Sequence, residues 1–190
     1  QSLGAINITS EQYDEIAEFT VNLTKKDTTQ LMKYKTIFNW ITSNIKYEYN
    51  DNDPYAVFKN RKAICQGYSN LLTVMCYSQG IPTMVVNGFL IDPNYGEVGH
   101  AWAYTCPDST WTVSDPTNKG TFTMKKYGNY GHLSPVTADV NIFSDDIAIY
   151  NYYDRLLNIK EVRTNSAAFI VPHSVNGFVV NSLNPVVELP

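Results

Sequence analysis

The sequence predicts an α+β fold, in which several helices come first and an antiparallel β-sheet follows. Apolar residues recur at helical spacing between residues 28 and 44, and a further helical stretch ends at residues 80–82, which read Gly-Ile-Pro. Beyond this point the runs become short and rich in Val, Thr, Trp and Tyr, which is typical of strands. Helices that precede the strands, rather than alternate with them, indicate an α+β architecture.

The predicted helices begin at capping signals, in which a side-chain oxygen can bind the backbone N–H three residues on. These signals are Thr9 with Gln12, Asp27 with Gln30, and Asp53 before Pro54. We expect the third of these helices to end near Phe58. A fourth helix is expected from Cys65 to Gln79, because Gly80 suits a helix end and Pro82 cannot continue one.

Strands are predicted over residues 83–90, 99–105 and 110–114. A two-residue turn at Pro107-Asp108 would pair the last two of them antiparallel. From Thr117 to Asn141 the pattern weakens, so we expect a loop and a short helix there. Residues 145–159 fit either one more helix or an extended segment.

The C-terminal stretch alternates short β-like runs, at residues 168–171 and 177–180, with turn residues, and Asn176-Gly177 suits a hairpin. Residues 169–185 also resemble the start of a leucine-rich repeat of the bacterial surface type, in which Ile-Pro-x-x-Val-x-Gly recurs. The alternative is a β-hairpin that packs on the main domain. We predict a main domain over residues 1–155 and a β-rich extension over residues 156–190.

The composition excludes several classes of protein. Of 190 residues, 44% are hydrophobic and 17% are charged, so we expect a sizeable core. The net charge is −4, so we do not expect a nucleic-acid partner. The densest basic cluster, Lys59, Arg61 and Lys62, is interpreted as a solvated face. No apolar run approaches the roughly 20 residues that span a bilayer. Because the chain begins at Gln1 rather than Met, we expect a signal peptide or anchor to have been removed.

The three cysteines, Cys65, Cys76 and Cys106, cannot all be paired with one another. On one helix, Cys65 and Cys76 would lie about 16 Å apart, which is beyond the roughly 7 Å that a disulfide allows. A bridge between Cys76 and Cys106 stays open, and a buried, inert thiol is the simplest role for each of them. No metal site or cofactor is expected, because the His and Cys residues lack ligand spacing.

Cys65 is predicted to begin a helix, where backbone N–H groups and the helix dipole favour a thiolate. The same N–H groups can bind the oxyanion of an acyl-transfer reaction, and Gly67 leaves room for a substrate chain. His100 lies in a predicted strand and can exchange a proton with a thiol. Asp115 ends the next strand, from which it can orient the imidazole. Taken singly, Cys65, His100 and Asp115 can each be explained by a structural role. Their order in the chain, each at the boundary of a helix or strand, favours a catalytic role for the three together.

The segments that carry these residues are CQGYSNLLTVMCYSQGIPTMVV, GHAWAYT and WTVSDPT. In this order they resemble the transglutaminase-like superfamily, over roughly residues 30 to 118. The resemblance implies a papain-like core with Cys65 as nucleophile, His100 as base and then acid, and Asp115 as orienter. It also offers Tyr47, with Gln66 and Trp102, as oxyanion or substrate-binding candidates, although packing alone would explain Tyr47 and Trp102.

The resemblance implies cysteine-dependent acyl transfer on a peptide or protein substrate, and we expect hydrolysis of a peptide or amide through a thioester acyl-enzyme. The alternatives are amide crosslinking through the same intermediate, or a catalytically inactive module that binds peptide or glycan. A loop from residue 119 to 141 that blocked the cleft would favour the inactive module. The Tyr-rich composition, with few Lys and Arg, favours an extracellular or cell-surface bacterial protein. The sequence makes no prediction of oligomeric state.

Overall fold

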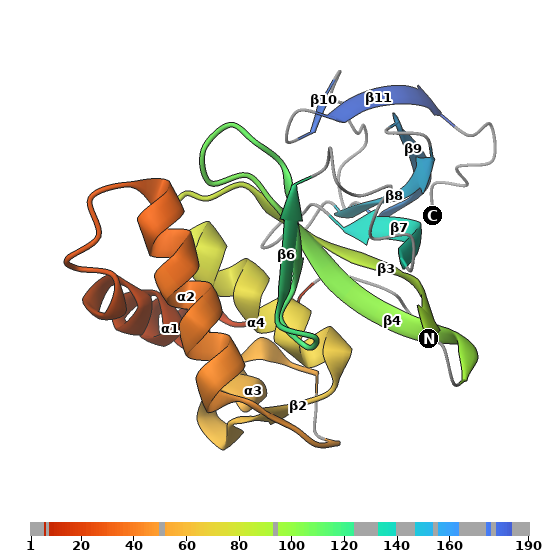
Figure 1. The fold of residues 1–190 in the computed structure, drawn as a ribbon. Coiled ribbons are helices and arrows are strands. Elements are labelled where there is room, and N and C mark those ends of the chain that lie inside the picture. Colours follow the sequence, from red (N-terminus) through yellow and green to blue (C-terminus); the bar gives the residue numbers. More distant parts are fainter. Residues whose placement is uncertain are drawn as a thin grey trace.

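The computed structural model describes residues 6, 8–49, 52–92, 95–123, 133–139, 147–153, 156–163, 174–175 and 178–183. It confirms the predicted α+β fold (Figure 1). The helices are α1 (Ser10–Leu23), α2 (Gln30–Asn44), α3 (Pro54–Asn60) and α4 (Cys65–Ser78). The strands are β1 (Lys46–Tyr47), β2 (Lys62–Ala63), β3 (Thr83–Asp92), β4 (Gly96–Thr105), β5 (Thr112–Asp115), β6 (Gly120–Thr123), β7 (Leu133–Asp139), β8 (Ile147–Tyr153), β9 (Leu156–Arg163), β10 (Ser174–Val175) and β11 (Phe178–Leu183).

Two groups of paired strands occur within these described ranges. One sheet has the order β10-β11-β9-β8-β7-β3-β4-β5-β6, in which only β11 and β9 run parallel. The short strands β1 and β2 form a separate parallel pair. Figure 1 shows the four helices grouped against the part of the sheet formed by β3 to β6, with β7 to β11 farther from them. No helix in the described ranges is long and apolar enough to cross a bilayer.

The core lies around α4, which contacts the other three helices as well as β3 and β4. Its residues from Gly67 to Cys76 are buried except for Asn70 at the boundary of the core. A helix that is apolar around most of its circumference must be covered on several sides, and this arrangement covers it. The N-terminus of α4 is thereby fixed against the sheet.

The helix boundaries confirm most of the capping predictions. Thr9 and Gln12 form the predicted capping box, and Asp53 caps α3 through the N–H of Ala56. The prediction that Asp27 starts the second helix is wrong. Thr29 caps α2 instead, because its hydroxyl lies three residues before Met32 N–H, to which it binds.

The predicted two-residue turn at Pro107-Asp108 is wrong. Thr105 pairs with Thr112, so six residues connect β4 to β5. A two-residue hairpin of the common type needs positive φ at both central residues, which proline cannot adopt. The chain instead reaches positive φ at Ser109, and the Asp108 carboxylate accepts a hydrogen bond from Thr110 N–H.

The loop and short helix predicted between residues 117 and 141 are wrong for residues 120–123 and 133–139, which form β6 and β7. Residues 124–132, 140 and 141 lie outside the described residues. Within the ambiguous range 145–159, the described residues 147–153 and 156–159 are extended rather than helical. The flanks of the predicted Asn176-Gly177 turn pair antiparallel, with Val175 opposite Phe178, although the turn itself, like residues 168–171, lies outside the described residues. The sequence missed β6 and β7 because pairing with other strands, rather than a local pattern, stabilises them.

The predicted boundary between residues 155 and 156 falls between β8 and β9, which pair with each other. The sheet is therefore continuous across this point. The division of the chain into a main domain and an extension stays a prediction.

The basic cluster is only in part the solvated face that we predicted, because Lys59 and Lys62 are exposed whereas Arg61 is half-buried. Lys59 and Lys62 are ion-paired with Glu15 and Glu48, respectively. Arg61 adopts a left-handed conformation at the end of α3, and its guanidinium lies over three aromatic rings. These rings are Trp40 at 4.4 Å, Phe58 at 4.7 Å and Phe19 at 5.9 Å from the guanidinium carbon. Cation–π contacts of this kind hold α1, α2 and α3 together.

The sequence suggested that Gly67 leaves room for a substrate chain, and this prediction is wrong. Gly67 is buried inside the protein. A Cβ built on it would lie 2.9 Å from both Ala63 Cβ and Val57 Cγ2. Glycine is therefore required by the close packing of α4 on α3 and β2.

Replacing this glycine should destabilise the fold. We expect Gly67→Ala to lower the free energy of unfolding by about 1–3 kcal/mol through overpacking, as measured by urea denaturation followed by circular dichroism. Gly99→Ala is the matched control, because a Cβ at Gly99 meets no atom within 4 Å. Equal midpoints for the two variants would contradict the packing role of Gly67.

Candidate active site

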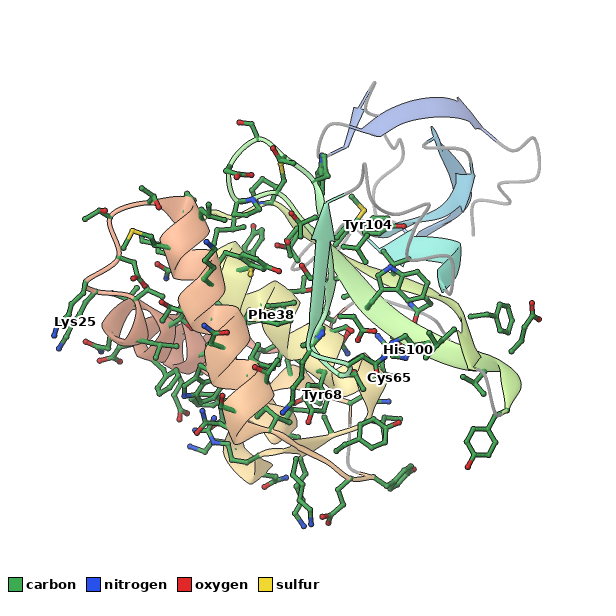
Figure 2. The ribbon with its side chains drawn as sticks, viewed as in Figure 1. Lys25, Phe38, Cys65, Tyr68, His100 and Tyr104 are labelled. Atoms are coloured by element: carbon green, nitrogen blue, oxygen red, sulfur yellow. The ribbon has the colours of Figure 1, made fainter. Side chains whose placement is uncertain are left out.

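Cys65 is the first residue of α4, and its side chain meets His100 of β4. Figure 2 shows the two side chains next to each other, between the N-terminus of α4 and β4. The residue before α4, Ile64, provides no side-chain cap. Backbone N–H groups of the first helical turn are thus available to a negative charge at this position.

His100 joins Cys65 to Asp115. Its Nε2 lies 2.9 Å from Asp115 Oδ2, and the two side chains are 6% and 0% exposed. Since Nε2 faces the carboxylate, Nδ1 is the ring nitrogen left for the hydrogen bond between His100 and the Cys65 side chain. The structure therefore brings together the three residues that the sequence singled out.

These contacts shift the ionisation of both partners. Burial opposes the thiolate of Cys65, but the hydrogen bond and charge of His100, with the N–H groups of Ala101 and Gln66, outweigh burial and lower the pKa of Cys65. Burial likewise opposes the imidazolium, yet the hydrogen bonds to Asp115 and Cys65 raise the pKa of His100 to about 9. Both shifts favour a thiolate–imidazolium pair.

The pairing of β4 with β5 brings His100 and Asp115 within reach of each other. Ala103 is opposite Ser114, so Asp115 comes level with Trp102, one residue on. His100 is therefore a diagonal neighbour of Asp115 on the same face of the sheet, a separation that these side chains span. Ser114 faces the other way, where its hydroxyl lies 2.6 Å from Tyr34 Oη of α2 and 2.8 Å from Thr105 Oγ1.

Asn118 is a residue of the site that the sequence reasoning missed. Its backbone N–H donates to Asp115 Oδ1 at 3.2 Å, and its Nδ2 donates to Asp115 Oδ2 at 2.8 Å. Two donors fix the plane of the carboxylate, so that Oδ2 is turned toward His100. The signal available in the sequence was the Asp-Pro-Thr-Asn turn, in which an Asp commonly bonds to the following backbone.

Ala101 was missed as well, because its contribution is a backbone group. Its N–H bonds to the sulphur of Cys65. The pairing of β5 with β4 ends at Ala103, so the N–H of Ala101 has no strand partner on that side in the described part of the chain. Because β5 is short, the N–H of Ala101 on this edge of β4 is left for the sulphur of Cys65, which accepts its hydrogen bond.

Tyr47, Gln66 and Trp102, the candidates for oxyanion or substrate binding, lie in three different surroundings. Tyr47 is 59% exposed and stacks on Tyr68 with ring centroids 6.4 Å apart, and both burial and the charge of nearby Cys65 raise its pKa. Gln66 directs its side chain to Asn70 Oδ1 at 2.9 Å. Trp102 is fully buried and stacks on His100 with centroids 6.0 Å apart, so it shields the imidazole from water.

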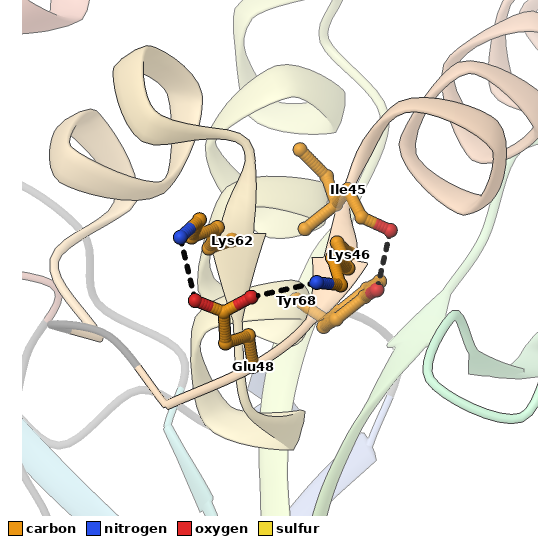
Figure 3. Close-up of polar contacts among 5 residues, drawn as sticks. All are labelled: Ile45, Lys46, Glu48, Lys62 and Tyr68. Atoms are coloured by element: carbon orange, nitrogen blue, oxygen red, sulfur yellow. Dashed lines mark hydrogen bonds and ion pairs between the residues drawn. The ribbon is translucent and has the colours of Figure 1, made fainter.

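Tyr47 is held in place by its neighbours in the chain. Figure 3 shows Glu48 binding both Lys46 and Lys62, which ties β1 to β2. Tyr68 of α4 donates a hydrogen bond from its hydroxyl to the carbonyl of Ile45 at 2.6 Å. The segment that precedes Tyr47 is therefore fixed to the first turns of α4, beside Cys65.

The other two cysteines are structurally distinct from Cys65. All three thiols are free, which answers the open question of a bridge between Cys76 and Cys106. Burial raises the pKa of Cys76 to about 12, and burial and Asp108 raise that of Cys106. Among the described residues, no group of three or more His, Cys, Asp or Glu side chains is arranged to hold a metal ion.

Comparison with known proteins supports the same fold. A family model of the transglutaminase-like superfamily matches residues 17–116. Kyphoscoliosis peptidase of Homo sapiens is 27% identical over 115 residues, which cover 53% of this chain but only 17% of that protein.

Two solved structures share the architecture. A candidate cysteine protease from Cytophaga hutchinsonii superimposes with a TM-score of 0.56 at 14% identity, covering 88% of this chain and 56% of its own. EGTA-treated LapG of Legionella pneumophila superimposes with a TM-score of 0.54 at 12% identity, covering 80% of this chain and 91% of LapG. At these identities the likeness shows the fold, and it confirms the predicted papain-like, transglutaminase-like class.

The shifted pKa values predict how the thiols react with iodoacetamide. Because alkylation follows the thiolate, Cys65 should react at lower pH than an ordinary thiol, while Cys76 and Cys106 should need higher pH. In His100→Ala the hydrogen bond and charge of His100, which lower the pKa of Cys65 most, are lost, while burial and the backbone N–H groups of Ala101 and Gln66 remain. We therefore expect the rate at pH 6 to fall at least about tenfold, measured per cysteine by mass spectrometry. Equal rates for the three thiols would contradict this account.

Removing the Asn118 amide should loosen the Asp115 carboxylate and weaken its support of His100. We expect Asn118→Ala to move the acid limb of Cys65 alkylation to higher pH, with a rate at pH 6 about three- to tenfold lower. Asn22→Ala is the matched control, because Asn22 is exposed and donates to the Glu18 carbonyl within α1. An unshifted profile in folded Asn118→Ala would mean that its side-chain amide does not position Asp115.

Proposed function

The chain belongs to the transglutaminase-like superfamily, and on that premise we propose that it hydrolyses peptide or amide bonds with Cys65 as the nucleophile. The family and fold support a cysteine-based enzymatic function in general. The observation that carries the finer proposal is the chain of contacts from Cys65 through His100 to Asp115.

In the acylation step, the Cys65 thiolate attacks the amide carbonyl and forms a carbon–sulphur bond, while the carbonyl oxygen becomes an oxyanion. The His100 imidazolium then gives its Nδ1 proton to the amide nitrogen, the carbon–nitrogen bond breaks and the amine leaves. Asp115 holds the imidazole in the orientation that presents Nδ1 to the thiol.

In the deacylation step, neutral His100 takes a proton from water, and the resulting hydroxide attacks the thioester carbonyl. The carbon–sulphur bond breaks, the carboxylic acid is released and the thiolate–imidazolium pair returns. The backbone N–H of Cys65, at the uncapped start of α4, is our main oxyanion donor, and the nearby Tyr47 hydroxyl is a second one.

Hydrolysis and transfer to an amine share the thioester, and they differ in which nucleophile reaches it. Cys65 is only half-buried, and Tyr47 beside it is 59% exposed, so water has access to the thioester. This access favours hydrolysis over crosslinking. The lowered pKa of Cys65 argues against an inactive binding module, which needs no thiolate.

The substrate that suits this chemistry is a peptide or protein, and an extracellular or cell-surface location stays part of the proposal. Such a location would supply polypeptide substrates from outside the cell. The segment from residue 119 to 141, whose placement over the cleft would favour an inactive module, lies in part outside the described residues.

The proposal is tested with fluorescein-labelled casein as an unfolded polypeptide, in ¹⁸O-water with dansylcadaverine as a competing amine. We expect new C-termini carrying ¹⁸O, with a rate that rises as Cys65 ionises and falls above about pH 9, as His100 loses the proton that the leaving amine needs. Cys65→Ser should lose at least about a thousandfold in rate.

The competing outcomes are distinguishable by mass spectrometry. Dansylcadaverine incorporated into casein would show transfer in place of hydrolysis. An absence of both products, with rapid alkylation of Cys65 retained, would overturn the proposal for this substrate class and favour a binding module.

A further inference from the structure

The edge of β4 that faces β5 is only partly covered in the part of the chain that the structure describes. β4 is ten residues long and pairs with β3 along its whole length. Its pairing with β5, however, comprises only Ala103, Tyr104 and Thr105. Residues 96–102 therefore have no described strand on that side. An unpaired strand edge presents backbone donors and acceptors to which another strand can add.

The direction of one backbone group shows which residues face this open edge. The N–H of Ala101 points to it, because that N–H bonds to the sulphur of Cys65. Residues two apart in a strand present their N–H and C=O to the same side, so Gly99 and Glu97 face the edge too. At about 3.3 Å per residue, Gly99 lies roughly 7 Å along the strand from Ala101. A peptide strand bound at Gly99 would therefore need about two more residues to reach Cys65, which bonds to Ala101.

The surroundings of Gly99 leave room for a second chain. Glu97 and Gly99 are exposed, whereas β4 is buried from His100 onward. A Cβ built on Gly99 would meet no atom within 4 Å. Phe89 is opposite Gly99 on β3 and is 42% exposed. With no side chain at Gly99, an apolar side chain of an added strand can reach the Phe89 ring.

We propose that the open edge of β4, at Glu97 and Gly99, binds the substrate polypeptide as an added strand and delivers its carbonyl to Cys65. This inference rests on the proposed function and names its substrate class: a polypeptide that is extended for several residues beside the scissile bond. Strand addition uses main-chain hydrogen bonds, so the edge recognises the main chain first, and an apolar side chain beside Phe89 second. A compact amide without flanking peptide makes none of these bonds.

The test uses acetyl-tetra-alanine chloromethyl ketone, which alkylates Cys65 without any need for turnover, and analogues that are each N-methylated at one amide. Methylation removes a donor, and alternate amides of an added strand face the edge. We expect the rate of Cys65 labelling to fall about tenfold for every second analogue and to stay within about twofold for the others. A uniform response along the peptide would overturn the inference.

Iodoacetamide separates this failure from a failure of the proposed function. A uniform N-methyl response with rapid acid-pH alkylation of Cys65 overturns the strand site alone. Slow alkylation at acid pH overturns the proposed function, and the strand site with it.

A pair of variants gives the same test from the side of the protein. Gly99→Pro removes the N–H that faces the edge, and it leaves the ladder to β3 intact because that ladder does not use this N–H. We expect it to slow peptide labelling about tenfold, while Gly99→Ala, which keeps the N–H, restores most of the rate. Iodoacetamide alkylation reports whether Cys65 is intact in each variant. Equal labelling of the two variants would overturn the inference.

Discussion

Cys65 has to satisfy two constraints at once, and the site depends on both. It is the first residue of α4, whose uncapped N-terminus favours a thiolate, and its sulphur also bonds to the Ala101 N–H at the edge of β4. The second constraint is met only because β5 stops pairing at Ala103. The packing of buried α4 against β3 and β4 then fixes the distance between nucleophile and base.

The electrostatics of the site follow from a contest between burial and hydrogen bonding. Burial disfavours the charged form of both Cys65 and His100. In each case hydrogen bonds and nearby opposite charge outweigh burial, so the pKa of Cys65 falls and that of His100 rises. Asp115 is fully buried yet accepts hydrogen bonds from His100 and from both donors of Asn118. A buried carboxylate with this many donors is held in one orientation, and that orientation is transmitted to the imidazole.

Most predictions from the sequence that rest on a local signal succeeded, the exceptions being the helix start at Asp27 and the turn at Pro107-Asp108. Capping residues and the Gly-Ile-Pro stop placed α1, α3 and α4, since each depends on residues within one helical turn. Predictions failed where the stabilising partner is distant. The local pattern does not reveal β7, whose ladder is formed with distant β3, or the burial of Arg61, whose three aromatic neighbours come from three helices.

By itself, the sequence determined which groups are available for chemistry and in which local settings: a thiol at a helix start, an imidazole in a strand and a carboxylate at a strand end. Tertiary structure alone decided that His100 and Asp115 are diagonal neighbours, that Asn118 clamps the carboxylate, and that the edge of β4 is open beside the nucleophile. The reason is physical, because strand register and strand length are set by pairing between segments far apart in the chain, and no local pattern encodes them.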